Sequence, residues 1–90
     1  MGAKAEIGWV HRDAAGERWD VYARLVGRDW KFFTRQRRYV VWQAVEEPPL
    51  EDWLELLDAL RRLMVRRRYQ PDDVARVEKV IRERFPEAEF

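Results

Sequence analysis

The chain has 90 residues, a net charge of +1 and no Ser, Cys or Asn. Most covalent catalysis uses a Ser, Cys or Thr nucleophile beside a base, and Thr34 is the only such residue, so this kind of enzyme is disfavoured. Without Cys the chain can form neither a disulfide framework nor a thiolate metal site. We therefore expect a protein that is not an enzyme, with an activity based on carboxylates or Tyr as the less favoured alternative.

The length and the apolar content set the class of protein. Hydrophobic residues make up 47% of the chain, which is enough for one domain with its own core. No run approaches the ~18 apolar residues of a membrane span, and the N-terminus lacks the apolar region of a signal peptide. We expect a soluble, cytoplasmic, single domain over 1–90, with a β-meander at 5–45, a two-helix layer at 50–85 and a loose tail at 86–90.

Alternating residues and a turn signal predict a first hairpin in the N-terminal quarter. The segment from Asp13 to Glu17 reads as a type I turn with Gly16 in the left-handed conformation, which closes a bulged hairpin. This turn also fixes the register, because alternation and turn geometry must agree on which face is apolar. The predicted register pairs Ile7 with Ala23, Trp9 with Val21, and His11 with Trp19.

The third and fourth strands are less well defined. A tight turn at Gly27–Arg28 or at Arg28–Asp29 places Trp30, Phe32 and Thr34 on the apolar face. The fourth strand, Tyr39–Val45, is apolar on both sides. A preceding loop of even length directs its alternate residues away from the core face, and a loop of odd length directs them into it. The sequence leaves both possibilities open for Val40, Trp42 and Ala44.

Two helices follow the strands. Pro48 and Pro49 end the fourth strand, and apolar spacing predicts helices from about Leu50 to Arg67 and from about Asp72 to Arg84. The order ββββαα predicts an α+β fold: an antiparallel meander of three to four strands with both C-terminal helices packed on one face. The expected core comprises Ile7, Trp9, Trp19, Val21, Leu25, Trp30, Phe32, Trp53, Leu54, Leu57, Leu60, Val77 and Ile81.

Residues that could carry catalysis or bind a metal have simpler explanations. His11 is the only histidine and lies at the end of the predicted hairpin, where we expect it to pack at the rim. One histidine cannot build the multi-histidine sites of zinc enzymes. The paired carboxylates lie at or near helix N-termini, where they stabilise the helix dipole. We therefore predict no catalytic, cofactor-binding or metal-binding residue.

The best functional lead is a basic segment with interleaved aromatic residues. Residues 24–38 hold six Lys or Arg side chains against one acid, Asp29. Tyr22 and Phe33 share the face away from the predicted core. Such a surface is typical of a contact with another molecule. We expect a protein partner, including a second copy of the chain, with nucleic acid as the alternative and with no membrane or small-molecule substrate. The candidate residues are Tyr22, Arg24, Lys31, Phe33, Arg35, Arg37, Arg38 and Trp42.

Overall fold

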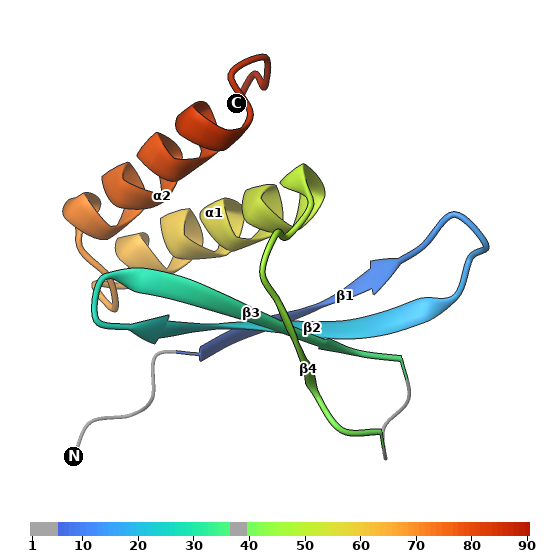
Figure 1. The fold of residues 1–90 in the computed structure, drawn as a ribbon. Coiled ribbons are helices and arrows are strands. Elements are labelled where there is room, and N and C mark those ends of the chain that lie inside the picture. Colours follow the sequence, from blue (N-terminus) through green and yellow to red (C-terminus); the bar gives the residue numbers. More distant parts are fainter. Residues whose placement is uncertain (1–5, 37–39) are drawn as a thin grey trace. The chain divides into compact units, whose positions relative to one another are not determined.

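The computed structural model describes residues 6–36 and 40–90. An antiparallel four-stranded sheet precedes two helices, which confirms the α+β class and the order ββββαα (Figure 1). The chain divides into two compact units, one ending at Pro48 and the other beginning at Pro49. The single domain and the packing of both helices on one sheet face stay predictions. The elements are β1 (Glu6–Arg12), β2 (Arg18–Val26), β3 (Asp29–Arg35), β4 (Gln43–Val45), α1 (Leu50–Val65) and α2 (Pro71–Arg84).

The first hairpin has the predicted turn and the predicted register. Gly16 has a φ of 83°, and the Asp13 N–H donates to the Glu17 carbonyl at 3.0 Å. The Gly16 N–H donates to the Asp13 carbonyl at 2.9 Å, which completes a bulge with glycine in the left-handed position. The strand pairs Ile7–Ala23, Trp9–Val21 and His11–Trp19 are all confirmed.

The Asp13 side chain holds this turn together. Its Oδ1 accepts hydrogen bonds from the N–H groups of Ala15 and Glu17, each at 2.9 Å. Its Oδ2 accepts from the Trp19 indole Nε1 at 3.0 Å. These hydrogen bonds favour the ionised form and lower the pKa of the Asp13 carboxyl below its ordinary value of 3.8. The bond from Trp19 has the largest effect.

The second hairpin resolves the choice between the two possible turns. Val26 pairs with Asp29, so the turn residues are Gly27 and Arg28. Gly27 has a φ of 64°, whereas Arg28 is not among the residues with positive φ. A positive φ at the first turn position alone is typical of a type II′ turn, which requires glycine there.

The fourth strand is shorter than predicted, because of the described residues 40–45 only Gln43–Val45 pairs with β3. Val41 is 81% exposed and lies outside the ladder, and Tyr39 lies outside the described residues. Thr34 pairs with Gln43, so the connection between these two residues contains an even number of residues. Consequently Ala44 lies opposite Phe33, away from the core face.

The sheet has one apolar face and one mixed face. We call the face that carries Ile7, Val21 and Phe32 the inner face, and the face that carries Gly8 and Tyr22 the outer face. Several predicted core residues of the inner face are only half-buried, which corrects the prediction. They lie on the edge strand or beside a hairpin turn, where a large side chain has too few neighbours to be fully covered. The half-buried residues are Trp9, Trp19, Leu25 and Trp30.

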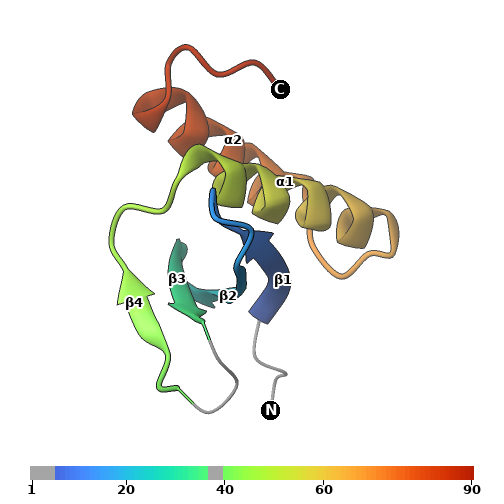
Figure 2. The ribbon, with the colours of Figure 1, turned by 90° about the vertical axis from the view of Figure 1, so that its right-hand side faces the viewer.

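The two helices bury one apolar stripe each and lie side by side (Figure 2). Trp53, Leu57, Leu60, Val77 and Ile81 are buried as predicted, whereas Leu54 is half-buried. The core also contains Ala23 in the sheet, and Leu56, Ala59 and Val74 in the helices, which the expected core omitted.

The end of α1 and the start of α2 each have a specific hydrogen-bond arrangement. α1 ends before the predicted Arg67 because Arg67 takes a left-handed φ of 63°. The Arg67 N–H donates to the Met64 carbonyl and the Arg68 N–H to the Leu63 carbonyl, which is the Schellman pattern. At the start of α2 the Gln70 N–H donates to the Asp73 carboxylate at 2.9 Å. In the described part of the chain, neither helix is long and apolar enough to cross a membrane.

Candidate interaction surface

The outer face of the sheet brings three predicted aromatic residues into contact. Tyr22 lies opposite Phe33 in the β2–β3 register, and their rings stack with centroids 4.8 Å apart at 17°. Trp42, just before β4, meets Tyr22 edge to face at 4.7 Å and 88°. We call these three residues the outer aromatic cluster. All three are half-buried, so the cluster is a packed platform with part of its surface open to solvent.

Two of the predicted basic residues flank this platform. The Arg24 guanidinium carbon lies 5.8 Å from the Tyr22 ring centroid, and that of Arg35 lies 4.2 Å from the Trp42 ring centroid. Both distances are within the range of a cation–π contact. Arg24 Nε and Nη2 also donate to Glu6 Oε2 at 2.8 and 2.6 Å, and this hydrogen bond raises the pKa of Arg24.

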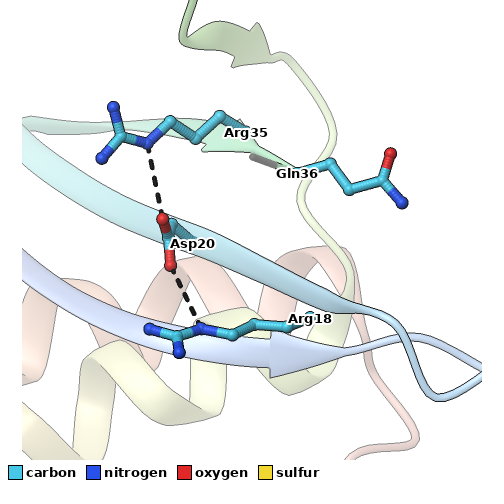
Figure 3. Close-up of a pocket in the computed structure, with 4 residues that line it drawn as sticks. All are labelled: Arg18, Asp20, Arg35 and Gln36. Atoms are coloured by element: carbon cyan, nitrogen blue, oxygen red, sulfur yellow. Dashed lines mark hydrogen bonds and ion pairs between the residues drawn. The ribbon is translucent and has the colours of Figure 1, made fainter. Parts of the chain in front are cut away.

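A hollow of about 380 Å³ lies at the other end of the outer face. There the Asp20 carboxylate lies between two guanidinium groups, with Arg35 Nε at 3.4 Å and Arg18 Nε at 3.5 Å (Figure 3). Gln36 also lines the hollow, and its side chain points away from Asp20. Arg18 and Asp20 were not among the candidate residues. The alternation of the second strand already places them on this face, so their position could have been predicted from the sequence.

Of the three remaining basic candidates, only Lys31 lies within the described residues. Lys31 is exposed and lies opposite Arg24 in the strand register. Arg37 and Arg38 lie outside the described residues. The structure therefore brings together six of the eight candidate residues: Tyr22, Arg24, Lys31, Phe33, Arg35 and Trp42.

A second hollow, open to solvent, lies over Gly8 on β1. Gly8 is opposite Tyr22, and its lack of a side chain contributes to an open hollow of about 750 Å³ that Tyr22 and Trp42 also line. A Cβ added at Gly8 would lie 3.4 Å from the Val21 carbonyl oxygen and 3.8 Å from the Tyr22 Cβ, both ordinary contact distances. Sequence reasoning missed this hollow, although the predicted register already placed a glycine opposite an aromatic residue.

Two arginines of the outer face are paired with carboxylates, and the described residues lack the arrangement of a metal site. Glu6 and Asp20 balance Arg24 and Arg35 directly across neighbouring strands. Within residues 6–36 and 40–90, no three or more His, Asp or Glu side chains gather in a group that could hold a metal ion. The chemistry that this surface offers is therefore aromatic packing, cation–π contact and hydrogen bonding.

Comparisons of the chain with protein-family models, with curated proteins and with solved structures gave no match.

Proposed function

We propose that the protein is a non-enzymatic protein-interaction module whose contact surface is the outer face of the sheet. The observation that carries this proposal is the outer aromatic cluster, flanked by Arg24 and Arg35. Tyr, Trp and Arg are the residues most enriched among those that dominate the binding energy of protein interfaces. Their side chains combine a large apolar area with hydrogen-bond donors, so they can bind an apolar patch with a polar rim.

The pairing of two outer-face arginines with carboxylates favours a protein partner over nucleic acid. Arg24 is bonded to Glu6, and Arg35 is paired with Asp20. A phosphate would have to displace these carboxylates or accept their repulsion. Base stacking also needs a free ring face, and one face of Tyr22 is covered by Phe33. A protein surface of mixed polarity meets neither obstacle.

Site-specific photo-cross-linking tests this proposal. A photoreactive amino acid replaces Lys31 on the outer face in one variant and Lys79 on α2 in a control variant. Both positions are exposed, and both replacements remove one lysine. After irradiation of cells that produce the chain, we expect discrete protein adducts from position 31, several times more abundant than those from position 79. Equal yields from the two positions, or no adducts from position 31, would contradict the proposal.

The alternative proposal is nucleic-acid binding, and the exposed Lys31 beside Phe33 is the observation in its favour. Phosphate contacts weaken steeply as salt rises, whereas apolar protein contacts do not. Fluorescence anisotropy distinguishes nucleic-acid binding from protein binding. It is measured with short labelled single-stranded and duplex oligonucleotides at low and near-physiological salt. Salt-sensitive binding that is lost in the double variant Phe33→Ala with Arg35→Ala would support the alternative. No binding at low salt would remove it.

The proposed cytoplasmic location follows from sequence composition alone. Fractionation of cells that produce the tagged chain tests it, and the expected result is recovery in the cytosolic fraction. Recovery with membranes or in the medium would contradict it.

A further inference from the structure

We propose that the β1 edge of the sheet pairs with the β1 edge of a second copy of this chain, antiparallel and centred on Trp9. The inference rests on the proposed function, because it names one protein partner of the module. The pairing would join two four-stranded sheets into one continuous sheet. It would also place the outer aromatic clusters of both copies on the same side of that sheet.

The backbone of β1 offers the hydrogen bonds for this pairing. Within the described sheet, β1 has a neighbour on one side only. Both the N–H and the carbonyl of Asp13 bond to the opposite side of the hairpin, at Glu17 and Gly16. Because bonding direction alternates along an antiparallel strand, the odd-numbered residues of β1 face β2 and the even-numbered residues direct their N–H and carbonyl groups outward. These outward residues, all of them exposed, are Glu6, Gly8, Val10 and Arg12.

The side chains of the outward residues complement one another when two copies of β1 run antiparallel. A pairing centred on Trp9 places Glu6 of one copy opposite Arg12 of the other, and Gly8 opposite Val10. Each relation occurs twice, because a two-fold axis relates the copies. Val10 is 48% exposed, and the hollow over Gly8 provides the space for the Val10 side chain of the second copy.

Other registers lose this complementarity. Moving the centre to Gly8 or to Val10 places that residue against its own copy and separates Glu6 from Arg12. If one copy moves by a single residue, its outward N–H and carbonyl groups meet residues of the other copy that form no such bonds. The N–H and carbonyl groups of those residues point toward the β2 strand of their own chain. The register centred on Trp9 is therefore the one that satisfies hydrogen bonding, charge and shape together.

A like-charge pair within each copy also favours the association. Arg12 lies directly opposite Arg18 in the β1–β2 register, which is an unfavourable arrangement for two cations. The Arg12 side chain donates to the Gly16 carbonyl at 3.1 Å, and Arg12 has no carboxylate partner among the described residues. Glu6 of the second copy, which is bonded to its own Arg24, would share its carboxylate with Arg12.

A charge-exchange experiment tests the proposed register by sedimentation equilibrium. The full chain is measured as wild type, as Arg12→Glu, as Glu6→Arg, and as an equimolar mixture of the two variants. Each variant alone would bring like charges together at both ends of the pairing. The mixture restores two opposite-charge pairs. We expect the wild type and the mixture to dimerise, and each variant alone to dimerise at least about tenfold more weakly, which is ~1.4 kcal/mol.

Two controls separate pairing from folding. Arg12→Glu replaces the like-charge pair with Arg18 by an opposite-charge pair, so its circular dichroism and melting temperature should match or exceed those of the wild type. Gly8→Val puts a branched side chain where Val10 of the second copy would lie and should also weaken the dimer at least about tenfold, whereas Gly8→Ala fits at ordinary contact distances and should weaken it less. A wild type that stays monomeric at high micromolar concentration would overturn the inference. Dimers that persist unchanged in either charge variant, or a mixture that fails to dimerise although both variants keep the circular dichroism of the wild type, would also overturn it.

The two proposals can fail separately. A monomeric wild type whose position 31 still forms adducts with other proteins would end the self-pairing inference and keep the interaction function. Charge-dependent dimers whose position 31 forms no protein adducts would keep the pairing of β1 and remove the role of the outer face.

Discussion

The indole N–H of Trp19 donates a hydrogen bond to the carboxylate of Asp13 at 3.0 Å, across the turn that closes the first hairpin. The same carboxylate accepts two backbone N–H groups of the turn. One side chain therefore fixes both the turn and the adjoining aromatic residue. This arrangement makes the hairpin sensitive to the protonation state of Asp13.

We expect stability to fall in acid partly through Asp13. The folded-state pKa of Asp13 is below its ordinary value of 3.8, so the unfolded chain binds this proton first as the pH falls. The stabilisation is present above 3.8 and is lost as the pH falls through the folded-state pKa. Urea titrations of the wild type and of Asp13→Asn between pH 6 and about 2.5 isolate this contribution. The difference in unfolding free energy should shrink across the acid range, and a constant difference would contradict the assignment.

Replacing Arg67 with glycine should stabilise the chain. Arg67 holds a φ of 63° at the end of α1, where a residue with a Cβ pays a conformational cost that glycine avoids. Arg67→Gly should raise the free energy of unfolding by about 1 kcal/mol. Arg66→Gly, one residue earlier with a φ of −89°, is the matched control and should not stabilise. Equal effects of the two substitutions would show that the left-handed conformation carries no such cost.

The buried stripe of α1 should dominate the stability of the two-helix unit. Leu60 is fully buried, so Leu60→Ala removes apolar contacts and leaves a cavity. We expect a loss of about 2–5 kcal/mol in the free energy of unfolding, measured with denaturant. Leu63 lies on the same helix and is half-buried, so Leu63→Ala should cost clearly less. A reversed order of the two losses would contradict the described packing.

Trp42 should matter more for partner contact than for folding. Its ring contacts Tyr22 and Arg35, and these contacts are worth about 1–2.5 kcal/mol together. Trp42→Ala should therefore lower stability by only about that amount while it removes most adducts formed from position 31. Unfolding of Trp42→Ala under native conditions would show that the tryptophan belongs to the core.

The first hairpin could be predicted in detail because two independent signals agreed. The turn from Asp13 to Gly16 and the alternation of apolar residues both required Trp9 to lie opposite Val21, as it does. The fourth strand could not be predicted equally well. The segment before it has no Gly or Pro to mark a turn, so neither its length nor its register followed from local chemistry.

The candidate surface could be predicted as a set of residues but not as a set of contacts. Alternation placed Tyr22 and Phe33 on one face, whereas their stacking depends on the pairing of β2 with β3. The contact of Trp42 with Tyr22 depends on where the chain returns to form β4. The pairing of Arg35 with Asp20 follows from the same strand register, which local sequence signals do not fix.

Photo-cross-linking from positions 31 and 79 tests the proposed function most directly, with the products treated separately with protease and nuclease. We expect adducts from position 31 that are sensitive to protease, resistant to nuclease and several times more abundant than those from position 79. Adducts that nuclease removes, or equal yields from the two positions, would contradict a protein-binding outer face.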